Sequence, residues 1–352
     1  MSRTSLSILA YNTHLFGESL ATKLISAAKK PLFYQDDRRA EIIATKINSS
    51  GADIVGLVEV WDDELARKII KEVEVVYPHH FPERKETDFL TKVGDFVINL
   101  TQKRLAGNGL LLLSKHPLTD PAFSEYEDRN GDDAWSRKGI LTAKADLPNL
   151  SEGGSPIKVR LFLTHTQAGE TKVDKENREK NIRQLQGFIQ PNGNFKRNDK
   201  DIPIFCIGDF NVIAECYGTG SPNEECKEPG QKTSEYQQII SILQEEEIEK
   251  EKVGLTDFYR ELHSNFNESP GYTYLSEGEN QPNKLITIFA KEDATNKVHQ
   301  RLDYIFYSQK GSAIKVTPTE AKVLGGYTYL DGREDMNLSD HEPLWGKFNL
   351  EI

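Results

Sequence analysis

The sequence is poor in cysteine and in long apolar runs, and each shortage excludes a class of protein. Three cysteines among 352 residues are too few for a disulfide scaffold. Cys216 and Cys226 nevertheless bracket a loop, and they can pair in an oxidising compartment. No stretch approaches the ~20 consecutive apolar residues that a membrane-spanning helix needs, and no signal-peptide core opens the chain. We therefore expect no transmembrane segment and a soluble chain, cytoplasmic as given or secreted if an export signal has been removed.

Positive charge is also scarce. The chain has 44 lysines and arginines against 55 aspartates and glutamates, which gives a net charge of −11. Such a chain has no sequence-wide excess of basic residues to hold nucleic-acid phosphates, which weakens polyanion binding without excluding it, so we expect no stable nucleic-acid partner. Divalent cations can reverse the sign of an acidic site locally, so a phosphate-containing substrate is not excluded. The oligomeric state is left open.

What the chain does contain is a succession of short apolar runs, most of which end in a polar residue. These runs are rich in β-branched and aromatic residues and are typical of strands. The expected strands are 6–11, 53–58, 110–113, 157–164, 203–208, 301–307 and 344–348. Apolar residues at helical spacing predict a helix that begins at Asp36 or Asp37, acting as its N-cap. They predict three more helices that begin near Asp62, Asp174 and Ser234. This alternation agrees with an α/β (α+β) chain, and a length of 352 residues allows one or two domains.

The segment 81–107 interrupts this alternation. At helical spacing, its apolar residues would form a stripe along one face of a helix. The stripe consists of Phe89, Val93, Phe96, Val97 and Leu100. Such a stripe either packs on the protein's own core or contacts lipid, and both interpretations remain open.

Polar side chains that can carry chemistry stand mostly where the expected strands end. They are Asn12, Glu59, His165, Asp209 with Asn211, Asp303, and Asp340 with His341. Carboxylates are oxygen ligands for hard divalent cations, and histidine suits proton transfer because it titrates near neutrality. Asp209 and Asn211 lie two residues apart, so on a strand they would point the same way and converge on one phosphate or water. An Asx-turn is the alternative.

The neighbours Asp340 and His341 would point in opposite directions on a strand. Asp340 is therefore a poor partner for His341, and Asp303 is the better candidate to orient the imidazole. Taken alone, His165 is an ordinary strand-end histidine.

The order of these motifs resembles the endonuclease/exonuclease/phosphatase superfamily of metal-dependent phosphoesterases, from about Leu6 to Phe348. The motifs that carry the resemblance are Tyr11-Asn12, Val58-Glu59-Val60, Gly208-Asp209-Phe210-Asn211, Leu302-Asp303-Tyr304 and Ser339-Asp340-His341. Within the superfamily the chain is most similar to the neutral sphingomyelinases (sphingomyelinase C), through Arg137-Lys138-Gly139 and Thr164-His165-Thr166-Gln167-Ala168. Inositol polyphosphate 5-phosphatases have a related histidine motif. They carry Trp-Cys-Asp-Arg where this chain reads Arg301-Leu302-Asp303-Tyr304.

The resemblance implies a DNase-I-like fold, a four-layered β-sandwich of two mixed sheets flanked by helices. It implies one catalytic domain over residues 1–352, with a possible lipid-contacting insertion at about 81–107. Mg²⁺, or another divalent cation such as Mn²⁺ or Co²⁺, would be held by Glu59, Asn12 and Asp340.

The implied reaction is in-line attack of water on a phosphodiester. His341, oriented by Asp303, would be the general base, and His165 would stabilise the developing charge or protonate the leaving group. Asp209 and Asn211 would position the water and a non-bridging oxygen. Lys138 would bind the phosphate.

The substrate we expect is a phospholipid at a membrane surface, with sphingomyelin cleaved to ceramide and phosphocholine. The alternatives are a metal-dependent endonuclease, an inositol-phosphate phosphatase, and a binding module that has lost catalysis.

Overall fold

Two six-stranded sheets form the centre of the computed structural model. The structure describes residues 3–17, 35–83, 107–150, 153–189, 202–216, 227–244, 254–276, 298–308, 313–331 and 334–351. Residues 84–106, most of the segment expected to contact lipid or the core, lie outside this described part, and so does Cys226. Cys216 is disulfide-bonded, whereas Cys206 is free and buried.

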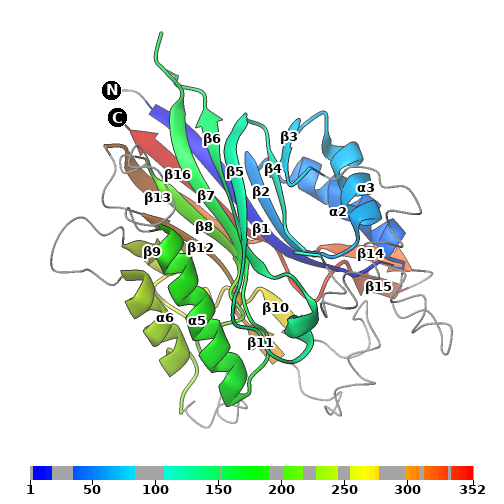
Figure 1. Cartoon of the computed structure of the whole chain (residues 1–352), viewed down its shortest axis with the longest axis vertical. Coiled ribbons are helices and arrows are strands. Elements are labelled where there is room, and N and C mark those ends of the chain that lie inside the picture. The colour runs from blue at the N-terminus through cyan, green and yellow to red at the C-terminus, as the bar shows by residue number, and fades with distance from the viewer. Residues whose placement is uncertain are drawn as a thin grey trace.

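The first sheet joins the two ends of the chain. Its order is β13-β16-β1-β2-β4-β3, with β1 antiparallel to β16 and parallel to β2 (Figure 1). The strands are β1 (Arg3–Leu15), β2 (Ile54–Val60), β3 (His79–Phe81), β4 (Leu111–Ser114), β13 (Lys315–Val323) and β16 (Leu344–Glu351).

The second sheet is built from the middle of the chain, in the order β5-β6-β7-β8-β12-β9, and β7 runs parallel to β8. Its strands are β5 (Leu118–Glu125), β6 (Gly139–Leu147), β7 (Ile157–His165), β8 (Ile204–Asp209), β9 (Leu255–Asp257) and β12 (Asp303–Ser308). Two small antiparallel pairs accompany the sheets. They are β10 (Tyr274–Ser276) with β11 (Val298–Gln300), and β14 (Thr328–Asp331) with β15 (Glu334–Asn337).

Four helices form near the positions that the sequence predicts. They are α2 (Asp36–Ser49), α3 (Asp63–Val73), α5 (Lys172–Ile189) and α6 (Ser234–Gln244). The short helix α7 (Phe258–Leu262) and the 3₁₀ helix η1 (Gly131–Trp135) were not predicted. Asp62 caps α3 by accepting the N–H groups of Glu64 and Leu65. Asp36 is not the N-cap of α2, which is Gln35. Among the described helices, none is both long and apolar enough to cross a membrane.

Three apolar clusters give the predicted four layers. The largest lies between the sheets and joins residues such as Ile8 of β1 to Leu161 of β7 and Ile207 of β8. The second packs α2 and α3 on the outer face of the first sheet, and the third packs α5 and α6 on the outer face of the second. The helices lie on opposite sides of the sandwich (Figure 1). The predicted fold class is therefore confirmed.

Candidate active site

At one end of the sandwich, the inward-facing rows of four central strands change from apolar to polar. In a strand, alternate residues face the same side. The rows are Leu6, Ile8, Ala10 and Asn12 in β1, Val159, Leu161, Leu163 and His165 in β7, Phe205, Ile207 and Asp209 in β8, and Tyr307, Ile305 and Asp303 in β12. The same alternation that fills the core therefore places four polar side chains above it.

Strand pairing and side-chain hydrogen bonds bring these four residues together. Asp209 pairs in register with His165 on one side and with Asp303 on the other. Asn12, from the opposite sheet, donates its amide to Asp209 Oδ2 and to Glu59 Oε1, both at 3.0 Å. Asn12 is fully buried, so this amide links the two sheets directly beneath the site.

Glu59 reaches the site because strand β2 breaks its own alternation there. Val58 packs in the core between the sheets, whereas Val60 packs under the helices on the outer face. The shift occurs at Glu59, whose φ of 58° is in the left-handed region that non-glycine residues rarely adopt. Burial alone would raise the pKa of Glu59, but the neighbouring His14, His165 and Lys138 hold it well below its usual range.

The imidazole of His14 is a member of the site that the sequence did not predict. Its Nδ1 lies 3.2 Å from Glu59 Oε2 and 3.4 Å from Asp340 Oδ1. His14 also has a left-handed backbone, with φ of 50°. The sequence offered one signal for His14, because it follows the predicted site residue Asn12 by two residues. Its conformation, however, cannot be read from an apolar pattern.

His341 lies against Asp303, the partner that the sequence favours over Asp340. The distance from Nδ1 to Asp303 Oδ2 is 2.7 Å, and Nε2 lies 3.8 Å from Asp209 Oδ2. Burial alone would lower the pKa of His341, but Asp303 and Asp209 raise it to about 10. Burial and the charge of Asp303 raise the pKa of Asp209 to about 7.

His165 is held differently, because neither of its ring nitrogens has a hydrogen-bond partner and only 1% of the residue is exposed. Burial, together with the nearby ammonium of Lys138, lowers its pKa well below the usual value. The Lys138 ammonium is itself buried. It lies 2.8 Å from Asp133 Oδ1 and donates to the carbonyl of Thr166 at 3.1 Å. Asp133, on η1, is a second contact that the sequence did not predict.

Asn211 lies beyond the end of β8, so strand alternation does not govern where it points. Its N–H donates to Asp209 Oδ1 at 2.7 Å, which is the Asx-turn considered as the alternative. The Asn211 amide donates to the carbonyl of Thr166 at 3.2 Å. This turn ties the end of β8 to the segment that follows His165.

The chemistry of the donor set fits a divalent cation. One ligand atom each from Glu59, His165 and Asp209 lies within 4.8 Å of the others, and a second such group joins Asp209, Asp303 and His341. The unpartnered nitrogens of His165 and Asp303 Oδ1 are buried polar atoms that a ligand would satisfy. Asp340 lies next to this cluster, because its Oδ1 is 3.4 Å from His14 Nδ1. The same oxygen accepts a hydrogen bond from Ser339 Oγ at 3.2 Å.

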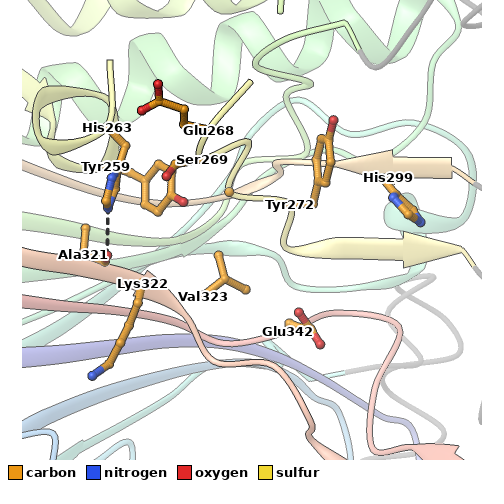
Figure 2. A pocket seen from close by; sticks show the side chains of 11 residues that line it. Tyr259, His263, Glu268, Ser269, Tyr272, His299, Ala321, Lys322, Val323 and Glu342 are labelled. Carbon is orange, nitrogen blue, oxygen red and sulfur yellow. Dashed lines mark hydrogen bonds between the residues drawn. The ribbon is translucent and has the colours of Figure 1, made fainter. Parts of the chain in front are cut away.

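A separate hollow of about 500 Å³ lies beside α7 and β13 (Figure 2). Figure 2 shows Tyr272 and His299 at one side of it and His263 bonded to the carbonyl of Ala321 at another, with a separation of 2.9 Å. None of the predicted site residues lines this hollow. It is therefore distinct from the carboxylate and histidine cluster, although its Glu342 follows His341 in the chain.

The fold and this cluster together define a class of protein, in which a sandwich of two sheets carries carboxylates, an amide and histidines at one end. The chain belongs to the Endonuclease/Exonuclease/phosphatase family, whose family model matches residues 10–341. The family membership expected from the motifs is confirmed.

Curated relatives of the chain include sphingomyelinases. It is 24% identical to sphingomyelin phosphodiesterase 5 of Danio rerio over 322 residues, covering 85% of this chain and 53% of that protein. It is 26% identical to sphingomyelinase C of Listeria ivanovii over 187 residues, covering 51% of this chain and 50% of that protein. The chain thus spans about half the length of the curated relatives it matches.

Solved structures share the fold at low sequence identity. Sphingomyelinase C from Streptomyces griseocarneus matches with a TM-score of 0.59 and 18% identity, covering 98% of this chain and 99% of that one. A beta toxin from Staphylococcus aureus with bound magnesium ions matches at 0.58 and 16%, covering 97% and 99%. TDP2 of D. rerio, complexed with a single-strand DNA product, matches at 0.56 and 15%, covering 98% of each chain.

Proposed function

We propose that the chain is a divalent-metal-dependent phosphodiesterase that hydrolyses a phospholipid at a membrane surface, with sphingomyelin as substrate and ceramide and phosphocholine as products. The observation that supports this reaction is that residues of both sheets converge at one end of the sandwich. The hydrogen-bonded pair His341 and Asp303 lies there beside Asn12, Glu59 and Asp209. The sphingomyelinases among the relatives support the choice of lipid.

When bound, a divalent cation such as Mg²⁺ withdraws charge from a phosphate oxygen and eases departure of the leaving oxygen. Glu59, Asn12 and Asp340 would hold it. The ammonium of Lys138 is buried beside His165 and Glu59, where it would attract the phosphate. His165 keeps a neutral imidazole, whose N–H would donate to the developing charge on the leaving oxygen.

His341 would take the proton of the attacking water, and Asp303 fixes its tautomer by binding Nδ1. To accept a proton His341 must be neutral, whereas its pKa is raised to about 10 by Asp303 and Asp209 against the effect of burial. A cation held by Glu59 and Asp340 would disfavour protonation of His341, because nearby like charges do so. We assign the base role to His341. Asp209 and Asn211 would orient the water.

A direct test offers the full-length protein Mg²⁺ with sphingomyelin vesicles, phosphatidylcholine vesicles and plasmid DNA in parallel. Phosphocholine release from sphingomyelin that stops with a chelator is the expected result. His341→Ala and Glu59→Ala should reduce it by ~10²-fold or more, as for loss of a positioned base or of charge stabilisation. The matched control is His263→Asn, outside the cluster. Near wild-type turnover by His341→Ala would refute the base role.

The competing function is cleavage of a nucleic-acid phosphodiester. A specific observation favours it, because TDP2 shares the fold in a complex with a DNA product. The net charge of −11 disfavours a long nucleic-acid track. Nicked plasmid with intact lipid in the same assay would reverse the order of the two proposals.

A further inference from the structure

The pair formed by Asp303 and His341 joins the start of a strand of the second sheet to the residues that precede a strand of the first. Asp303 is the first residue of β12 and pairs in register with Asp209 of β8. His341 lies ahead of β16, where it forms an isolated bridge with Tyr274. The 2.7 Å contact between His341 Nδ1 and Asp303 Oδ2 therefore depends on what places these two backbones.

The side chain of Thr273 fixes the backbone of Asp303. Its Oγ1 accepts the N–H groups of Leu302 and Asp303, both at 3.1 Å. A hydroxyl oxygen has two lone pairs, and these two N–H groups use both of them. Thr273 and Asp303 are fully buried, and buried N–H groups are costly to leave without an acceptor. The start of β12 is therefore tied to this one hydroxyl.

The main chain of the same residue holds the segment of His341. The Thr273 carbonyl accepts the N–H of Glu342 at 2.6 Å. The next residue, Tyr274, is bridged to His341, and the two rings meet edge-on with their centroids 5.1 Å apart. Thr273 thus contacts the Asp303 segment through its side chain and the His341 segment through its main chain.

We propose that Thr273 is a positioning residue for the reaction, and that its hydroxyl sets the contact between Asp303 and His341. This inference rests on the proposed function in taking His341 as the base. Thr273 acts through the pair and not on the substrate itself. A displacement of about 1 Å at reacting groups can cost ~10²-fold in rate, so the loss of one buried acceptor should be measurable.

The test compares variants that differ at a buried hydroxyl. Thr273→Val keeps the branched shape but lacks the acceptor, and Thr273→Ser keeps the acceptor. The matched control is Ser308→Ala at the opposite end of β12. There the buried Ser308 hydroxyl accepts the N–H of Ile204 at 2.9 Å. Loss of either hydroxyl deprives the backbone of β12 or of its neighbour β8 of an acceptor, but only Thr273 adjoins the pair.

Three measurements are made on each full-length protein. The first is kcat and KM for phosphocholine release from sphingomyelin vesicles with Mg²⁺. The second is NMR of the metal-free protein carrying isotope-labelled histidine, which detects the Nδ1–H of His341 bonded to Asp303. The loss of this signal in His341→Gln assigns it. The third is the urea midpoint, which reports stability separately from the geometry of the pair.

Thr273→Val should lower kcat by ~10-fold or more and change KM by less than ~3-fold, because the groups that bind the substrate remain. Its Nδ1–H signal should shift upfield or broaden by exchange with water. Thr273→Ser should keep both kcat and the signal close to those of the wild type. Ser308→Ala should lower the urea midpoint but leave kcat and the signal unchanged.

An unchanged Nδ1–H signal in Thr273→Val, or an equal loss of kcat in Ser308→Ala or Thr273→Ser, would overturn the proposal. If Thr273→Val does not fold, Thr273→Ala takes its place with the same expected and contrary outcomes. If no substrate is hydrolysed, the proposed function fails, and the NMR signal alone decides whether Thr273 sets the pair.

Discussion

At the scale of single residues, the Asp303 carboxylate sets the protonation of His341. The 2.7 Å contact between Nδ1 and Oδ2 is buried, and Asp303 is the largest of the influences that raise the pKa of His341, to about 10. Asp303→Asn should move this pKa back toward its ordinary value and reduce turnover by ~10²-fold or more, through loss of the correct tautomer. NMR titration of the metal-free protein measures the first effect. An unchanged His341 pKa would show that the carboxylate does not control it.

Some site residues were predictable from the sequence and others were not, for a physical reason. Asn12, Asp209 and Asp303 continue rows that alternate with period two, so their common side follows from the pattern. Glu59 has the right position, but its orientation depends on a left-handed backbone that reverses the alternation. His14 depends on the same kind of backbone and on Arg39, a contact between distant segments that no local pattern encodes.

At the scale of elements, strands β7 and β8 must approach closely for Asp209 to lie beside His165. Gly208 pairs with Thr164, has φ of 137°, and a Cβ there would lie 1.9 Å from the carbonyl oxygen of Thr164. Gly208→Ala should therefore lower the free energy of unfolding by more than ~1 kcal/mol and displace Asp209. Urea denaturation provides the measurement. The control is Gly153→Ala, because Gly153 has φ of 72° and a Cβ added there would meet no atom within 4 Å. An equally large loss of unfolding free energy in Gly153→Ala would mean that the backbone φ, and not the close approach of the strands, causes the effect.

The start of strand β12 is anchored by ion pairs, which should make stability depend on pH. Arg301 lies 2.9 Å from Glu215 and 2.7 Å from Asp257, and it immediately precedes the Leu302-Asp303 segment. Burial alone would raise the pKa of Glu215, but Arg301 and Arg260 lower it in the folded state. A lowered folded-state pKa means that the unfolded chain binds the proton more tightly.

The contribution of Glu215 is therefore fully present above its ordinary pKa of 4.5 and is lost as the pH falls through the lowered value. Urea midpoints between about pH 6 and about pH 3 should fall more steeply for the wild type than for Glu215→Gln, which no longer titrates. The variant should also be less stable at neutral pH by ~3–5 kcal/mol, since it leaves Arg301 partly unpaired. Parallel pH profiles for the two proteins would contradict this account.

At the scale of the whole molecule, we propose that the core between the sheets makes the described chain one cooperative unit. That core contains Leu6 of β1 and Leu350 of β16 together with Leu161 and Ile207 of the second sheet, so neither sheet can bury its inner face alone. We expect one calorimetric unfolding transition. Ile207→Ala should destabilise the protein by ~2–5 kcal/mol through the cavity it leaves, and should shift that transition as a whole. The contrary result would be two unfolding transitions, only one of which shifts in Ile207→Ala. It would mean that the chain divides into separate domains and that the site joins residues from both.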